Sequence, residues 1–274
     1  MVRCLSRQIQ MLNEELIASK ATTESITGMK WWNDRLLTFT TTRPENYSFV
    51  AGQYARLGLR DDNGIIWRAF SMVSAPAETA TLEFYGIIVA HGLFTTRLKS
   101  LRTGDPILLE KQRYGFMTPD RFKDGSDLWM LSTGTGVGPY ISMLRDPYVW
   151  QHFRNLVLVH CVRHANEFAY TEELERLCRE PAFGSSAQLH VVRSVTRETS
   201  LPANAPYLQG RITTLLEDGR LEKAAGVPLS MNTSRIMMCG NPEMIDDMRA
   251  LLHQRGMRPD RRATPGQYVT ENYW

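Results

Sequence analysis

Residues 127–144, DLWMLSTGTGVGPYISML, decide the fold of the second half of this chain. They open with an apolar run, residues 128–131, that is typical of a buried strand. A glycine-rich turn follows from Thr133 to Gly138, and Pro139 suits the first turn of a helix. The free N–H groups and the positive dipole end of that helix favour a phosphate in the turn. The stretch therefore predicts either a dinucleotide-binding crevice or a plain strand–helix turn, because its glycine spacing departs from G-x-G-x-x-G.

The sequence after residue 125 alternates β-prone and helical patterns. We expect strands at residues 128–131, 156–162, 188–195 and 235–239, and helices at residues 139–145, 170–179, 212–217 and 242–255. In a chain that alternates in this way, the strands form a parallel sheet whose right-handed crossovers place helices on both faces. The fold expected for this half is therefore a Rossmann-like α/β domain.

The first half consists of short β-prone runs separated by turns. The expected strands are residues 36–42, 53–59, 65–72, 81–88 and 106–110, with a hairpin at Asn63 and Gly64 and a short helix at residues 95–101. Runs this close together leave no room for crossover helices, so we expect an antiparallel sheet closed into a small β-barrel. The predicted domains are an N-terminal extension (1–25), the barrel (26–122) and the α/β domain (123–274).

The composition argues against a nucleic-acid-binding, membrane-spanning or metal-binding protein. The net charge of +3 over 274 residues is too small to indicate nucleic-acid binding, and no apolar run approaches the roughly 18 residues of a membrane span. The four cysteines, Cys4, Cys161, Cys178 and Cys239, are widely separated. We therefore expect no metal site and the reduced thiols of a cytoplasmic protein. Acidic residues within residues 1–25 argue against a targeting signal, so this segment is interpreted as a docked helix or a mis-assigned start.

Basic residues follow the predicted parallel strands. Arg163 follows the second strand, Arg197 follows the third, and Arg211 precedes a helix. Three guanidinium groups at one sheet edge would bind a 2′-phosphate, which favours NADP over NAD, although a single arginine taken alone is more often a solvated surface charge. Glu167 is an alternative partner for a ribose. Cys239 ends the fourth strand, where it is either an inert buried thiol or a contact to a nicotinamide.

The barrel half contains the string WRAFSMVSAP at residues 67–76. In a strand, Arg68 and Phe70 would share one face and Ser71 would point to the other. An arginine can bind a pyrophosphate, an aromatic ring can stack on a flat ligand, and a hydroxyl can bond a heteroatom. From these residues alone, an ordinary strand with a cross-strand pair is the better explanation of the string.

Several motifs together resemble one known family. They are Arg68-Ala69-Phe70-Ser71, Gly92-Leu93-Phe94-Thr95-Thr96, Gly134-Thr135-Gly136-Val137-Gly138-Pro139-Tyr140, Cys239-Gly240-Asn241-Pro242 and Tyr273-Trp274. Their identity and order resemble those of bacterial-type ferredoxin (flavodoxin)–NADP(+) reductases of the plant-type superfamily. The resemblance implies a FAD-binding β-barrel followed by an NADP-binding α/β domain, with both cofactors meeting between them.

The resemblance also implies roles for individual residues. Arg68 would bind the FAD pyrophosphate, Phe70, where the family usually has tyrosine, would stack on the flavin, and Ser71 would bond near flavin N5. Tyr273 and Trp274 would pack against the flavin ring and the adenine. The other implied cofactor-binding residues are Gly92, Thr95 and Thr96 for FAD, Thr133, Gly134, Gly136 and Gly138 in the turn, and Arg163, Arg197 and Arg211 for the 2′-phosphate. The candidate catalytic residues are Ser71, Cys239 and Tyr273.

The implied activity is electron transfer between NADPH and a ferredoxin or flavodoxin, by hydride transfer between nicotinamide C4 and flavin N5. The chain lacks a cysteine set for its own iron–sulfur cluster, so the carrier would be a separate acidic protein that docks on a basic rim. We expect a monomer that binds no nucleic acid or membrane. The alternatives are an oxygenase-associated or general flavin reductase, a non-catalytic nucleotide sensor, and an interaction scaffold without flavin.

Overall fold

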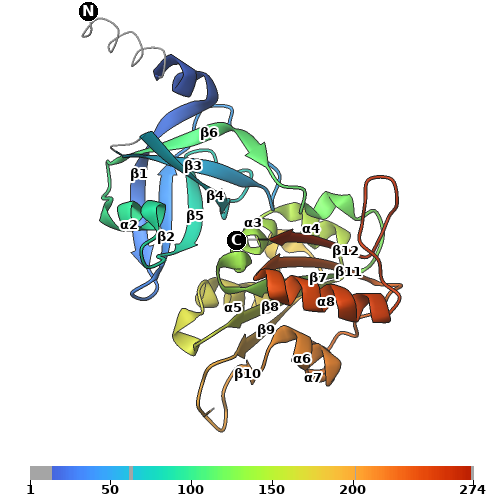
Figure 1. Cartoon of the computed structure of the whole chain (residues 1–274). Coiled ribbons are helices and arrows are strands. Elements are labelled where there is room, and N and C mark those ends of the chain that lie inside the picture. The colour runs from blue at the N-terminus through green and yellow to red at the C-terminus, as the bar shows by residue number, and fades with distance from the viewer. Residues whose placement is uncertain (1–13, 62–63, 201, 273–274) are drawn as a thin grey trace, which may run out of the picture.

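The structure is a computed structural model that describes residues 14–61, 64–200 and 202–272. Figure 1 shows two parts side by side, an antiparallel barrel from the first half of the chain and a layered α/β domain from the second. The expected change of architecture along the chain is confirmed. Within the described ranges, no helix combines the length and the apolar character needed to cross a membrane.

The barrel is built from consecutive short strands. Its elements are β1 (Ala21–Trp31), β2 (Leu36–Thr42), β3 (Tyr54–Asp61), β4 (Gly64–Ser71), β5 (Thr81–Ile87), α2 (Leu93–Ser100) and β6 (Pro106–Tyr114). The strands pair in the antiparallel order β4-β3-β6-β1-β2-β5. A bridge between Met72 and Phe84 joins the end of β4 to β5 and so closes the barrel. Phe39, Phe70 and Phe94 pack together in its interior.

The second domain is a parallel sheet covered by helices on both faces (Figure 1). Its strands are β7 (Asp127–Thr133), β8 (Asn155–Val162), β9 (Gln188–Val195), β10 (Leu208–Gln209), β11 (Ser234–Gly240) and β12 (Tyr268–Asn272). Its helices are α3 (Gly138–Leu144), α4 (Pro147–His152), α5 (Thr171–Arg179), α6 (Ile212–Glu217), α7 (Arg220–Ala225) and α8 (Pro242–Gln254). The order β10-β9-β8-β7-β11-β12 reverses between β7 and β11, which places a topological switch point there.

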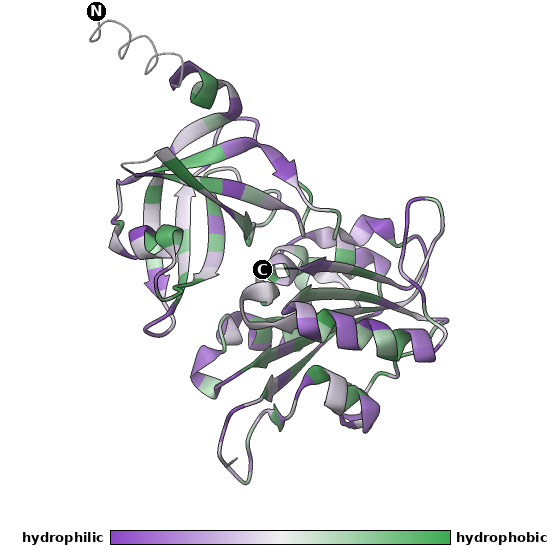
Figure 2. Cartoon of the chain, in the orientation of Figure 1, coloured by the Kyte–Doolittle hydropathy of each residue, from purple (hydrophilic) through white to green (hydrophobic). Residues whose placement is uncertain are grey.

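One of the apolar clusters in the core is continuous between the domains. Residues of the sheet and of α3, α4 and α5 pack with Leu36, Ala51, Val73 and Tyr85 from the barrel half. A second cluster fills the opposite face of the sheet beneath α6, α7 and α8. Figure 2 accordingly shows the hydrophobic colour on the parallel strands and the hydrophilic colour on the outer turns of the helices. The domain interface is therefore an extension of the core, which excludes water from the seam.

Strand β1 begins at Ala21, within the segment that the sequence predicts as an N-terminal extension (1–25). Residues 21–25 pair with residues 106–110 of β6, and Ala21 and Glu24 are buried there. Residues 14–20 are helical, and residues 1–13 of the expected extension lie outside the described residues. Asp61 pairs with Gly64, as expected for the hairpin, although Asn63 also lies outside them.

Candidate functional site

The glycine-rich turn lies at the switch point of the sheet. It leaves β7 at Thr133, forms a short 3₁₀ turn over Gly134–Val137, and leads directly into α3. The turn after β11 lies against it, since Asn241 N donates to Thr133 Oγ1 at 2.8 Å. Open parallel sheets bind their ligands outside the carboxyl ends of the strands at this position, so the fold favours the crevice over a plain turn.

The glycines of this turn have two different physical functions. A Cβ at Gly136 would lie 2.5 Å from the carbonyl oxygen of Cys239, and a Cβ at Gly240 would meet Thr133 Oγ1. These two glycines therefore let the turns after β7 and β11 pack against each other. Gly134 has a φ of +54° and nothing within 4 Å of its Cβ direction, so its open side leaves room for a ligand backbone or phosphate.

Thr135 adds a polar group to the same turn. It is 2% exposed, and its hydroxyl has no hydrogen-bond partner in the part of the chain that the structure describes. Buried hydroxyls normally have a partner, so this group fits a site whose ligand supplies one. The hydroxyl of Thr135, unpartnered among the described residues, and the open side of Gly134 are the two features of this turn that suit a bound dinucleotide. The sequence reasoning did not single out Thr135.

The expected arginines lie at one edge of the sheet. Arg163 and Arg197 follow the neighbouring strands β8 and β9, and Arg197 N donates to Arg163 O at 2.9 Å. Arg211 caps α6 next to β10. All three are exposed, and no carboxylate within the described ranges forms an ion pair with their guanidinium groups. Glu167 Oε2 accepts from Arg163 N at 2.9 Å, so its carboxylate holds the loop backbone.

The barrel places the expected FAD-binding residues on β4 and α2. Arg68 is exposed, whereas Phe70 is 8% exposed and contacts Phe94 of α2 at 5.4 Å between ring centroids. Ser71, expected on the opposite face from Phe70, is buried as well, because β4 closes the barrel at this point. Gly92 caps α2, and a Cβ there would lie 2.6 Å from Thr95 Oγ1. The first turn of α2, which includes Thr96, lies beside β4, because Phe94 contacts Phe70.

Cys239 and Glu271 lie side by side where β11 and β12 meet the barrel. Cys239 is fully buried, and burial raises the pKa of its thiol well above the usual value, which favours the inert-thiol interpretation. Burial also raises the pKa of Glu271 from 4.5 to about 7. The carboxyl group of Glu271 can therefore hold or release a proton near neutral pH. Sequence reasoning missed this residue, although it stands two positions before Tyr273.

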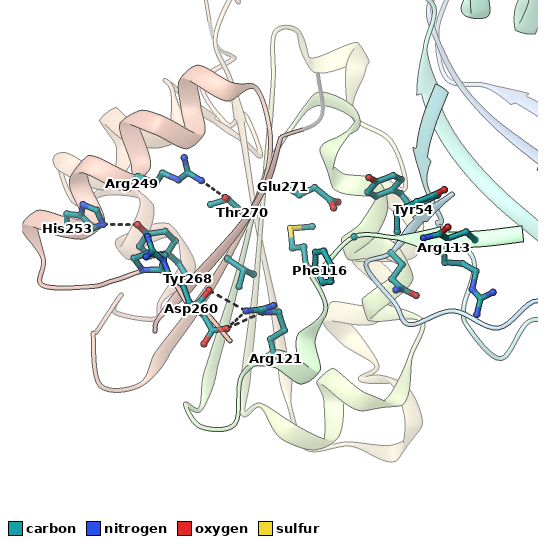
Figure 3. Close-up of a pocket in the computed structure, with 18 residues that line it drawn as sticks. Tyr54, Arg113, Phe116, Arg121, Arg249, His253, Asp260, Tyr268, Thr270 and Glu271 are labelled. Carbon is teal, nitrogen blue, oxygen red and sulfur yellow. Dashed lines mark hydrogen bonds and ion pairs between the residues drawn. The ribbon is translucent and has the colours of Figure 1, made fainter. Parts of the chain in front are cut away.

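A cavity of about 770 Å³ runs along the outer edge of β12 (Figure 3). Figure 3 shows Tyr54 and Phe116 on its barrel side, and Arg113 beyond Tyr54 with its guanidinium directed away from β12, where Nη1 donates to Lys111 O. The cationic side chains that line it are Arg113, Arg121, Arg249 and Arg261. Arg121 is paired with Asp260 at 2.7 Å. Among the described residues, its lining contains none of those expected to bind FAD or NADP.

The C-terminal aromatic pair and the cysteines complete the expected site residues. Tyr273 and Trp274 lie outside the described residues. Among the described residues, no cluster of three or more His, Cys, Asp or Glu side chains has the geometry of a metal site. The free thiols of Cys161, Cys178 and Cys239 are separate from one another.

Comparisons with known proteins agree with this architecture. An oxidoreductase FAD-binding domain matches residues 29–111, and an oxidoreductase NAD-binding domain matches residues 130–250. The chain is 37% identical to a flavodoxin/ferredoxin–NADP reductase of Escherichia coli (92% of this chain, 98% of that protein). It is 34% identical to a ferredoxin–NADP reductase of Azotobacter vinelandii (92% and 97%).

A solved structure is similar over nearly the whole chain. This ferredoxin NADP+ reductase from Neisseria gonorrhoeae, with bound FAD and NADP, superimposes with a TM-score of 0.86 at 37% identity, covering 93% of this chain and 99% of that one. Both domain types, their order and the full-length similarity agree. The chain therefore belongs to the flavodoxin/ferredoxin–NADP reductase family.

Proposed function

We propose that this protein is an FAD-dependent enzyme that transfers electrons between NADPH and a ferredoxin or flavodoxin. The observation that carries the proposal is the contact between the two motif segments. Ser142 Oγ of α3 donates to the carbonyl oxygen of Ser74 at 2.7 Å. Cγ2 of Val73 would lie 3.4 Å from a Cβ added at Gly138. The end of the flavin-binding strand and the start of the nucleotide-binding helix therefore adjoin. The full-length relatives named as such reductases support the same activity.

The protein residues bind, orient and shield the reacting groups. Bound FAD would supply the chemistry that links two-electron transfer from NADPH to one-electron transfer to a carrier. Arg68 and the first turn of α2 hold the FAD phosphates, and Ser71 places its hydroxyl where β4 ends. The continuous apolar core between the domains keeps water from the reacting rings. Glu271 supplies a protonatable group beside Cys239 in this seam.

The three arginines at the ends of the strands select NADPH over NADH. Arg163, Arg197 and Arg211 are exposed at one edge and have no ion pair to a described carboxylate. Guanidinium groups hold phosphate through charge-assisted, forked hydrogen bonds, and the 2′-phosphate is the group that distinguishes the two nucleotides.

Carrier preference tests the proposed activity against its alternatives. NADPH-dependent reduction of ferredoxin and flavodoxin is compared with reduction of free flavin mononucleotide at equal concentration. A carrier-linked reductase turns over the proteins far more efficiently. A general flavin reductase prefers the free flavin, and a nucleotide sensor binds NADPH without reducing either acceptor.

We place the carrier at the cavity beside β12. Phe116 is 81% exposed and lines this cavity together with the cationic side chain of Arg261, and this combination suits an acidic protein with an apolar centre. The cavity also reaches Glu271 and Tyr54, and Tyr54 pairs with Ser71 across β3 and β4. A carrier bound there therefore lies close to the proposed flavin site.

Charge reversal tests this docking site. Arg261→Glu is expected to raise the KM for ferredoxin and for flavodoxin at low salt, while NADPH-dependent reduction of ferricyanide stays unchanged. Arg179→Glu is the matched control, because Arg179 is an exposed arginine at the end of α5, away from the cavity. An equal effect of both variants on the carriers assigns the effect to net charge and removes this docking site.

We also propose that the protein works as a monomer in the cytoplasm. The free, separate thiols of Cys161, Cys178 and Cys239 suit a reducing compartment. Size-exclusion chromatography with light scattering is expected to give a mass near 31.3 kDa. A stable dimer contradicts the first part of this proposal.

A further inference from the structure

A partly buried ionic cluster centred on Arg145, which ends α3, joins the two domains. Arg145 Nε and Nη2 donate to the two carboxylate oxygens of Glu173, each at 2.8 Å, in the fork that a guanidinium provides. Its Nη1 donates to Glu83 Oε2 at 2.8 Å and to Val73 O at 3.1 Å. Glu173 belongs to α5 of the α/β domain, whereas Glu83 and Val73 belong to the barrel half. One side chain therefore bridges both domains.

Tyr170, which precedes α5, extends this cluster into the barrel. Its hydroxyl donates to Glu83 Oε1 at 2.9 Å and lies 2.8 Å from Thr38 Oγ1. Trp32 Nε1 donates to Thr38 Oγ1 at 2.9 Å, and the ring centroids of Trp32 and Tyr170 are 5.1 Å apart. Tyr170 has a φ of +58°, a left-handed conformation that a bulky residue adopts where its surroundings hold it. Strands β2 and β5 are thereby bonded to the start of α5.

The cluster lies a short distance from both cofactor-binding motifs. Helix α3 begins at Gly138, the last glycine of the turn, and its seven residues span about 10 Å at ~1.5 Å per residue. In the barrel, Val73 lies two residues beyond Ser71. The bond from Ser142 to Ser74 ties the same two segments together. A displacement of the cluster therefore also displaces the glycine-rich turn and the end of β4.

We propose that Arg145 is a positioning residue, which sets the separation of the nicotinamide and flavin rings by clamping the α/β domain onto the barrel. This proposal rests on the proposed electron transfer from NADPH to FAD. Reacting atoms must approach to about 3–3.5 Å, and a displacement of about 1 Å lowers a rate by about 100-fold. A looser clamp slows flavin reduction and leaves the residues that bind each cofactor in place.

The test separates binding from the chemical step. FAD-loaded Arg145→Lys protein, which keeps the charge but loses the fork, is mixed anaerobically with NADPH in a stopped-flow instrument. We expect the limiting rate of flavin reduction to fall about 10- to 100-fold, with the dissociation constant for NADPH and the FAD content unchanged. Arg154→Lys is the matched control, because the ion pair of Arg154, to Asp127 at 3.9 Å, stays within the α/β domain.

Hydrogen exchange gives a readout that does not depend on turnover. In the FAD-loaded protein without NADPH, Arg145→Lys is expected to speed exchange of backbone amides in β5 and α5, and Arg154→Lys is not. Tyr170→Phe removes one hydroxyl and no charge, so it serves as a milder second variant if Arg145→Lys fails to fold. It is expected to give a smaller decrease of the same limiting rate.

Three results overturn the proposal. The first is a limiting rate of flavin reduction that stays at the wild-type value in both Arg145→Lys and Tyr170→Phe. The second is an equal loss of this rate in Arg154→Lys. The third is a slower rate in Arg145→Lys without faster amide exchange in β5 and α5. If NADPH does not reduce the flavin of the wild-type protein at all, the proposed function is overturned instead, so the two failures are distinguishable.

Discussion

Replacing Glu271 by glutamine gives a prediction whose size follows from the structure. The carboxyl group is largely buried where β12 meets the barrel, and its Oε2 atom has no hydrogen-bond partner among the described residues. Burial penalises the charged form, so the pKa rises from 4.5 to about 7 on folding. The folded protein thus binds more protons than the unfolded chain between these pH values. Its stability accordingly falls as pH rises through this window.

The magnitude is set by the size of the shift. A shift from 4.5 to about 7 corresponds to about 3 kcal/mol of stability that is present below pH 4.5 and lost above pH 7, at about 1.4 kcal/mol for each pKa unit. Glutamine stays neutral at every pH. Glu271→Gln is therefore expected to gain about 2–3 kcal/mol over the wild type when the pH is changed from 5 to 8.

Urea unfolding followed by circular dichroism at pH 5 and pH 8 measures this difference. Comparing the two proteins at each pH cancels all other titrations, and Glu217→Gln, an exposed carboxylate on α6, is the matched control. If the difference between Glu271→Gln and the wild type is the same at both pH values, the carboxyl group is not held in its neutral form by burial, and the reasoning is refuted.

Three further predictions concern the cofactor sites. Arg197→Glu removes a charged hydrogen bond to the 2′-phosphate, worth about 1.5–3 kcal/mol. It should therefore raise the KM for NADPH by about 10- to 100-fold and leave the KM for NADH unchanged. An equal effect on both nucleotides contradicts the assignment. Gly136→Ala puts a Cβ 2.5 Å from the carbonyl oxygen of Cys239 and should cost about 1–3 kcal/mol, seen as a lower thermal midpoint; an unchanged midpoint contradicts the close packing of the two turns. Deleting Tyr273 and Trp274 should weaken FAD retention or improve use of NADH, and unchanged flavin content and nucleotide preference would remove their proposed role.

The sequence predicts the elements whose signals are local. The predicted ranges 188–195 and 212–217 coincide with β9 and α6, because the strand has a long β-prone run and the helix has an apolar face. In contrast, β12 was missed, since the sequence YVTEN is short and polar and becomes a strand through pairing with β11. Helix α4 was also missed, although Asp146 caps it by accepting from Tyr148 N and Pro147 follows directly.

The candidate site residues that the sequence could locate are those in contiguous motifs or at the ends of predicted strands. The turn from Thr133 to Gly138 and the arginines after β8 and β9 could be located from the order of strands and turns. Glu271 could not, because its burial and its position beside Cys239 depend on the register of two strands. The cluster around Arg145 joins segments far apart in the chain, so no spacing in the sequence indicates it.

The central claim is that the barrel and the α/β domain bring a bound flavin and NADPH together in one chain. An absorbance spectrum of the freshly purified protein, recorded before and after anaerobic addition of NADPH, tests it most directly. We expect a yellow protein whose flavin absorbance bleaches with NADPH and more slowly with NADH. A protein that contains no FAD and takes none up, or a flavin that NADPH leaves oxidised, would contradict it.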